Sequence, residues 1–96
     1  MLKSKAMTPG SIVSLRILNG DELIARLLDS TAESVTLTNP MVVAVSEEGA
    51  GAIPWFALGD ASVVNIKMTH IYSMVPAKFE AAEEYIKNMA KVENNA

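Results

Sequence analysis

Apolar and polar residues alternate along the start of the chain. In residues 11–18, Val13, Leu15 and Ile17 fall on one side of an extended chain, with polar residues between them. A period of two is typical of a strand that is buried on one face. The pattern therefore predicts a half-buried strand.

A hairpin is predicted directly after this strand. Asn19 and Gly20 both tolerate a positive φ, as a type I′ turn requires, and residues 22–28 resume the alternation. The second strand places Leu23, Ala25 and Leu27 on one face and Ile24, Arg26 and Leu28 on the other.

The middle of the chain is also predicted to be extended. Residues 35–45 are rich in β-branched side chains, and Pro40 marks an edge, a bulge or a sharp bend because proline cannot donate to a ladder. A short polar loop, residues 29–34, precedes this strand, and the charges and glycines of residues 46–52 predict a flexible loop after it.

Two further extended segments follow. Residues 53–68 form one that is interrupted near Gly59-Asp60, and residues 70–75 form a short last strand. The count of predicted strands is five, joined by hairpins. Five strands are too few for a sandwich and fit a small, strongly bent barrel over about residues 11–75.

The period changes to that of a helix after Pro76. The apolar stripe over about residues 77–91 consists of Phe79, Ala82, Ile86 and Met89. Glutamates lie toward the positive end of this helix and lysines toward its negative end. The stripe either covers the barrel or a neighbouring subunit, or docks a partner helix. With no repeat or long linker, residues 1–96 are expected to form one domain.

Two apolar segments lack charged residues that would protect an exposed sheet edge. Residues 41–45 and 70–75 are therefore predicted to be edges that pair between subunits. The expected interface residues are Val42, Val43, Val45, Ile71, Tyr72 and Met74.

Composition narrows the classes of function. Half of the 96 residues are apolar and 20% are charged, which favours a subunit interface on a small domain. The net charge of −3 disfavours a protein that wraps duplex DNA. The chain has no cysteine, which excludes disulfides and thiolate metal sites, and no signal-peptide or membrane-span pattern, so we expect a cytoplasmic protein.

Two stretches resemble the motifs of Sm and Sm-like proteins. "VSLRILNGDELIARLLDSTAESVTLTNP" resembles the first motif and "NIKMTHIYSMVP" the second, in the family's order. "IPWF", before the second motif, is similar to Sm-like proteins encoded by phages. The resemblance implies a bent five-stranded barrel of the SH3-like type. It also implies a closed ring of five to seven copies, in which the fourth strand of one subunit pairs with the fifth of the next.

The resemblance also implies where RNA would bind. In the family, the loop after the second strand supplies an Asp, a residue that stacks on the base and an Asn. Those positions fall here on Thr31 (or a deletion), near Glu33, and on Ser34. The family's Arg-Gly pair corresponds to Lys67-Met68 in this chain, and the glycine in the family's second strand corresponds to Ala25. The implied uridine site is therefore reduced to Ser34 and Lys67, with Met68 and His70 beside them at the ring pore.

Each of these residues also has a simpler interpretation. Lys67 and His70 contact phosphates or bases, or they are a solvated lysine and a turn histidine. Trp55 and Phe56 stack on bases, or they pack in the core or an interface. His70 has no second histidine, cysteine or suitably spaced carboxylate, so we expect no metal site.

No motif for catalysis is apparent. The adjacent pairs Asp21-Glu22, Glu47-Glu48 and Glu83-Glu84 do not face each other across a pocket, as general acid–base catalysis requires. We expect no enzyme, cofactor or small-molecule substrate. Two hypotheses stay open: a homo-oligomeric Sm-like ring that binds single-stranded RNA, and a ring that acts as a protein-interaction scaffold without RNA.

Overall fold

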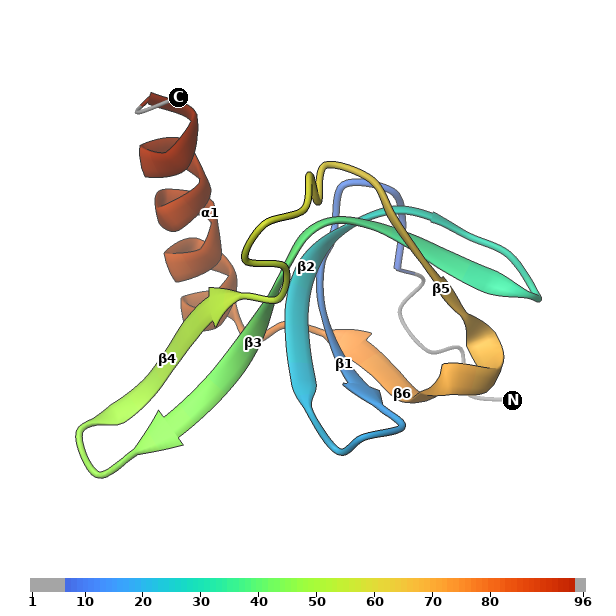
Figure 1. The fold of residues 1–96 in the computed structure, drawn as a ribbon, viewed down its shortest axis with the longest axis horizontal. Helices are drawn as coiled ribbons and strands as arrows, with labels where there is room; N and C mark the ends of the chain where they lie inside the picture. The colour runs from blue at the N-terminus through green and yellow to red at the C-terminus, as the bar shows by residue number, and fades with distance from the viewer. Residues whose placement is uncertain (1–6, 95–96) are drawn as a thin grey trace.

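The structure is a computed structural model that describes residues 7–94, with side chains described as far as residue 91. The described chain forms one antiparallel sheet followed by one α-helix (Figure 1). The elements are β1 (Ile12–Ile17), β2 (Glu22–Ser30), β3 (Ser34–Ser46), β4 (Gly49–Pro54), β5 (Val64–Lys67), the 3-10 turn η1 (Met68–His70), β6 (Ile71–Pro76) and α1 (Phe79–Asn94). The prediction of a mainly β chain with a C-terminal helix is confirmed.

β1 and β2 form the predicted hairpin, but its turn is of another type. Gly20 has a φ of 92°, whereas the φ of Asn19 is not positive. The Gly20 N–H donates to the Ile17 carbonyl at 2.9 Å, and the Ile17 N–H donates to the Asp21 carbonyl at 3.0 Å. This is a three-residue loop that ends in a left-handed glycine, so only one residue has to adopt a positive φ.

β3 is a long strand that bends at Asn39 and Pro40. Asn39 has a φ of 47°, and the register with β2 shifts between Ile24 and Arg26. Of the edge, bulge or sharp bend predicted at Pro40, the structure has a bulge and a bend. The bend divides β3 into a first half that pairs with β5 and a second half that pairs with β4.

The hairpin between β3 and β4 corrects the predicted loop over residues 46–52. Only Glu47 and Glu48 form the turn, and β4 begins at Gly49. Gly49 has a φ of 122°, which allows so tight a turn. The small residues after Gly49 pair with β3, mostly opposite its valines. The glycine-rich stretch therefore forms a tight turn and a strand, not the predicted flexible loop.

The predicted extended segment 53–68 is also interrupted earlier than expected. Residues 55–63 belong to no strand, and they lie over the bend of β3. The Trp55 N–H donates to the Pro40 carbonyl at 3.0 Å, and the Asn39 N–H donates to the Ala61 carbonyl at 2.7 Å. Because β3 changes direction there, a single straight partner strand cannot follow it.

The main apolar cluster lies on the inner face of the bent sheet. Its buried members are Val13, Leu15, Ile17, Leu23, Ala25, Leu27, Val35, Leu37 and Ile66. The predicted inward faces of β1 and β2 are confirmed. Full burial of each leucine contributes about 1.5–3 kcal/mol relative to exposure, so this cluster supplies most of the apolar stabilisation.

α1 packs on the opposite face, over Ile24 and Met41. Its buried residue is Tyr85, which is 3% exposed, while Phe79 and Ile86 of the predicted stripe are 76% and 47% exposed. Ala82 and Met89 of the stripe are half-buried, and Met89 packs against the same cluster. The helix therefore buries one side of the predicted stripe, with Tyr85 at its centre, and leaves Phe79 and Ile86 outside. Neither α1 nor any other helix within residues 7–94 is long and apolar enough to cross a membrane.

A hydroxyl group explains the orientation of α1. Tyr85 Oη lies 2.9 Å from the Thr38 carbonyl oxygen and 3.0 Å from that of Asn39. The phenol thus donates to the bend of β3 while its ring packs on apolar side chains. Turning α1 to bury Phe79 and Ile86 as well would break this contact.

The strand order β4-β3-β2-β1-β6 leaves β4 and β6 at its two ends, with β5 beside β3. The prediction that residues 70–75 form an edge is confirmed, since β6 pairs with β1 alone within the described chain. The prediction for residues 41–45 fails at Met41 and Val42, which pair with both β2 and β4, whereas residues 43–45 pair with β4 alone within the described chain. The formation of β4 moves the edge from β3 to β4.

Candidate nucleic-acid interface

The two motifs that predicted an RNA site meet at the ladder between β3 and β5. Ser34 lies opposite Lys67, and Thr36 lies opposite Asn65. The Met68 N–H, just beyond β5, donates to the Glu33 carbonyl at 2.8 Å. Segments far apart in the sequence are therefore held side by side by backbone hydrogen bonds.

Alternation along this ladder separates polar from apolar side chains. Val35, Leu37 and Ile66 are buried in the main cluster, and Val64 packs against it. The four polar residues between them lie on the other side of the ladder because successive side chains of a strand point to opposite faces. We call these residues the polar strip: Ser34, Thr36, Asn65 and Lys67.

Asn65 connects the strip internally. Its Nδ2 donates to Ser34 Oγ at 3.2 Å and to Thr36 Oγ1 at 2.9 Å. These bonds hold the amide plane, and within the described chain its Oδ1 accepts no hydrogen bond from protein. The sequence analysis missed Asn65, although a polar residue between two inward apolar residues of a strand is a signal for an outward position.

The loop before β3 is held in one shape by Thr31. Thr31 Oγ1 accepts the N–H groups of Glu33 and Ser34, each at 3.1 Å, and the Thr31 N–H donates to the Ser34 carbonyl at 2.8 Å. The Thr31 hydroxyl is thus occupied by hydrogen bonds within the loop itself. It orders the loop and leaves the exposed Glu33 side chain beside the strip.

The predicted site residues differ in what they present to solvent. Lys67 is exposed, and the one ion pair among the described side chains joins Arg16 and Glu22, so Lys67 is not neutralised by a carboxylate there. His70 is exposed at the end of η1. Met68, in contrast, is half-buried against the main cluster, so only its backbone reaches the loop.

The aromatic pair also divides. Trp55 is half-buried and packs against the main cluster, whereas Phe56 is 43% exposed. Their ring centroids lie 5.1 Å apart at an interplanar angle of 58°. The packing interpretation therefore describes Trp55, whereas Phe56 is partly open to solvent.

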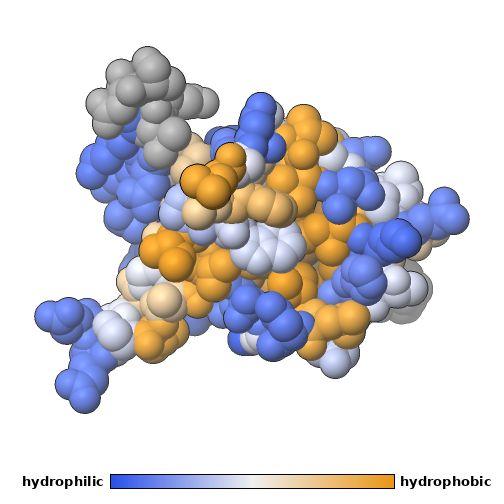
Figure 2. Space-filling model, in the orientation of Figure 1, coloured by the Kyte–Doolittle hydropathy of each residue, from blue (hydrophilic) through white to orange (hydrophobic). Residues whose placement is uncertain are grey.

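The six predicted interface residues are similarly split. Ile71 and Met74 of β6 pack against the main cluster, as does Val42, and Val43 packs against the cluster under α1. Tyr72 is 68% exposed and Val45 is 80% exposed. Apolar residues are spread across the middle of the face drawn in Figure 2.

The chemistry available at the strip is hydrogen bonding and charge. It offers one ammonium group, two hydroxyls and one amide, which are donors and acceptors for phosphate oxygens and base edges. No group of three or more His, Asp or Glu side chains capable of holding a metal ion occurs among the described residues. The chain matches no family model, and no curated protein is significantly similar to it in sequence.

Proposed function

We propose that this chain is an Sm-like protein that assembles into a homo-oligomeric ring and binds single-stranded RNA along the polar strip. The observation that carries the proposal is the ladder pairing of Ser34 with Lys67. The resemblance assigned these two residues to one site, and the β3–β5 register puts them opposite each other.

The proposed fold is the SH3-like barrel of the Sm type. Three observations support it: β3 bends so that β4 and β5 both pair with it, β1 lies between β2 and β6, and η1 is the only connection between β5 and β6. A strongly bent sheet of this kind curves around one apolar cluster.

The two open edges support the ring. β4 and β6 lie at opposite ends of the strand order, so pairing β4 of one copy with β6 of the next is a head-to-tail contact. Such a contact repeats until the ring closes. Exposed apolar residues lie on both strands, with Ile53 61% exposed on β4 and Tyr72 68% exposed on β6. The resemblance implies five to seven copies.

In this proposal Lys67 contacts phosphate, and Asn65 and Ser34 contact base edges. Asn65 is favoured for the base because its amide is already oriented and its Oδ1 accepts a donor without rearrangement. A single strip of this kind binds weakly. A ring repeats it in every subunit and raises the avidity for a strand that touches several subunits.

The test is binding of fluorescently labelled oligo(U) and oligo(A) at low salt, followed by anisotropy. We expect binding that weakens with salt, a loss in Lys67→Ala, and a loss of base preference in Asn65→Ala. Lys87→Ala removes the same charge from the exposed surface of α1 and serves as the control. Equal binding by Lys67→Ala and Lys87→Ala would contradict the assigned site.

The ring is tested separately by native mass spectrometry and light scattering. Ala52→Pro removes one backbone N–H from β4, the strand proposed to pair between subunits. Ala57→Pro, in the segment outside the strands, is the control. A monomer at micromolar concentration would contradict the ring, whatever the outcome with RNA.

A ring that acts as a scaffold without RNA is the second candidate. The lack of positive charge around the polar strip favours this candidate. No lysine or arginine occurs between Arg26 and Lys67, and Glu33 lies beside Ser34. An assembled ring that binds neither oligonucleotide at low salt would select this candidate.

A further inference from the structure

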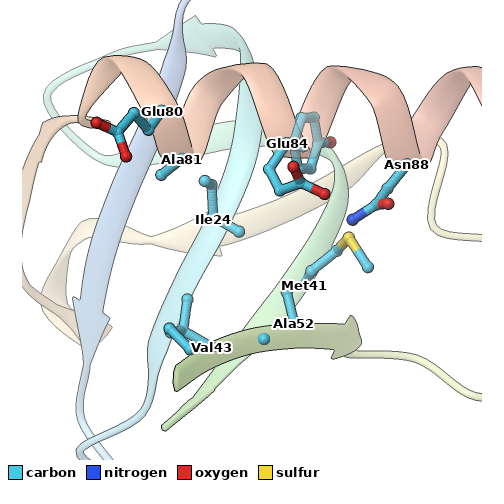
Figure 3. Close-up of a pocket in the computed structure, with 11 residues that line it drawn as sticks. Ile24, Met41, Val43, Ala52, Glu80, Ala81, Glu84 and Asn88 are labelled. Carbon is cyan, nitrogen blue, oxygen red and sulfur yellow. The ribbon is translucent and has the colours of Figure 1, made fainter. Parts of the chain in front are cut away.

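A groove separates α1 from the hairpin formed by β4 and the second half of β3 (Figure 3). Its volume is about 450 Å³, within the range of sites that bind small ligands or a few side chains. The groove exists because α1 contacts the sheet mainly through Tyr85, which leaves the helix raised above β4. It follows from the helix orientation described above.

The floor of the groove is apolar. It is formed by Ile24 of β2, Met41 and Val43 of β3, and Ala52 of β4 (Figure 3). Ala50 and Gly51, also of β4, have small or no side chains, which keeps this end of the groove open. An occupant can therefore bury apolar side chains against the sheet without displacing any element.

The wall contributed by α1 is polar and acidic. Glu80, Glu84 and Asn88 are spaced four residues apart, so they form one row along the helix, one turn between neighbours. No lysine or arginine lines the groove. Among the described side chains, neither glutamate makes an ion pair or a side-chain hydrogen bond, so both carboxylates are free to meet a cation.

The pattern of this groove specifies a partner. An apolar floor beside a row of carboxylates complements an amphipathic helix with apolar residues on one face and Lys or Arg one turn apart along its flank. A second copy of this chain is a poorer match, because the chain carries a net charge of −3 and like charges across an interface are unfavourable.

We propose that the groove between α1 and the β3–β4 hairpin binds a basic amphipathic helix of another protein. The apolar face of that helix packs on Ile24, Met41 and Val43, and its basic row pairs with Glu80 and Glu84. Asn88 accepts or donates one further hydrogen bond at the end of the row.

This inference goes beyond the proposed RNA binding. The loop before β3 and η1 lie at the opposite end of the molecule from α1 (Figure 1). The groove also lies on the face of the sheet, whereas the proposed subunit contact uses the outer edge of β4. Ring assembly, RNA binding and helix binding can therefore occur together and be tested separately.

The test uses a synthetic helical peptide with leucines on one face and lysines one turn apart beside them. The control peptides are the same sequence with glutamate in place of lysine, and a scrambled sequence of equal charge. We expect the full chain to bind the basic amphipathic peptide and neither control. Binding is measured by fluorescence anisotropy and by isothermal titration calorimetry.

Two pairs of substitutions separate the groove from general charge. Glu80→Gln with Glu84→Gln should weaken peptide binding about tenfold, the effect of losing two partly exposed ion pairs. Glu47→Gln with Glu48→Gln removes the same charge at the hairpin turn and should leave the affinity unchanged. Circular dichroism confirms that each variant is folded.

Ala52→Phe tests the floor, because the added ring fills the groove without altering charge. We expect it to abolish peptide binding. The proposal is overturned if the basic and scrambled peptides bind equally, if both glutamate pairs weaken binding to the same extent, or if Ala52→Phe has no effect.

Discussion

The two faces of the sheet are stabilised in different ways. The inner face carries nine buried residues of the main cluster, contributed by β1, β2, β3 and β5. The cluster on the outer face has three buried residues, Ile24 and Met41 of the sheet and Tyr85 of α1, and Tyr85 donates its hydroxyl to the backbone. The inner face is thus maintained by many apolar contacts of equal kind, and the outer face depends on one side chain.

This difference accounts for the placement of the two candidate sites. The polar strip is the outward side of strands whose inward side is fixed by the main cluster, so its side chains are held in a rigid frame. The groove arises where the outer cluster ends and α1 is not fully packed. A rigid strip suits a hydrogen-bonded ligand, and an incompletely covered apolar face suits a partner that completes it.

The largest effect should come from the inner face. Leu15→Ala should lower the free energy of unfolding by about 2–5 kcal/mol, because it leaves a cavity at a position that is 1% exposed. Leu58→Ala is the matched control, since Leu58 is fully exposed, and should change stability by less than about 0.5 kcal/mol. Urea unfolding followed by circular dichroism gives both values; equal losses would refute the assigned core.

The stability of the outer face should depend on one hydroxyl group, that of Tyr85. Tyr85→Phe removes the donor to the Thr38 and Asn39 carbonyls and should cost about 1–2 kcal/mol. Hydrogen exchange should accelerate in α1 before it does in β1 and β2. Tyr72→Phe changes the same group at an exposed position, and a loss of stability there as large as in Tyr85→Phe would contradict the special role of Tyr85.

The same contact should depend on pH. Burial raises the pKa of the Tyr85 phenol above its ordinary value, and Arg26 offsets part of that increase. A raised pKa means that the fold favours the neutral phenol. Its contribution to stability is therefore complete below about pH 10 and is lost as the pH rises through the higher folded-state pKa.

We expect the stability difference between wild type and Tyr85→Phe to shrink above about pH 10. Urea unfolding of both proteins across the alkaline range measures this difference directly. A difference that is constant from neutral pH into strongly alkaline solution would show that the phenolic proton is not involved.

The smallest effect should come from the exposed side of the predicted helix stripe. Phe79→Ser should change the stability of the monomeric fold by less than about 0.5 kcal/mol, since Phe79 is 76% exposed. Thermal unfolding at low protein concentration is the measurement. A loss of several kcal/mol would show that the stripe, rather than Tyr85, attaches α1.

Much of the fold was predictable because local pattern and burial agree. The alternation through β1 and β2 predicted their inward residues, and Pro40 predicted the bend of β3. Residues 49–52 were assigned to a loop, because glycine and alanine give no apolar alternation. Their strand forms only because the valines of β3 are available to pair with them.

The candidate site was predictable in part for a similar reason. Ser34 and Lys67 were found through a resemblance, and the register places them opposite each other. Asn65 was overlooked because its importance comes from bonds to Ser34 and Thr36, which lie on another strand. Met68 was assigned to the site through the same resemblance, as the second residue of the family's Arg-Gly pair, yet its side chain packs inward.

The sequence by itself determined which residues of β1 and β2 face inward, where their hairpin turns and that a helix follows the last strand. These features depend on residues close together, whose spacing matches the repeat of a strand or a helix. The tertiary structure alone decided which strand forms the edge, how α1 is rotated and that a groove lies beneath it. Each depends on a contact between distant segments: β4 with β3, and the Tyr85 hydroxyl with the bend at Asn39.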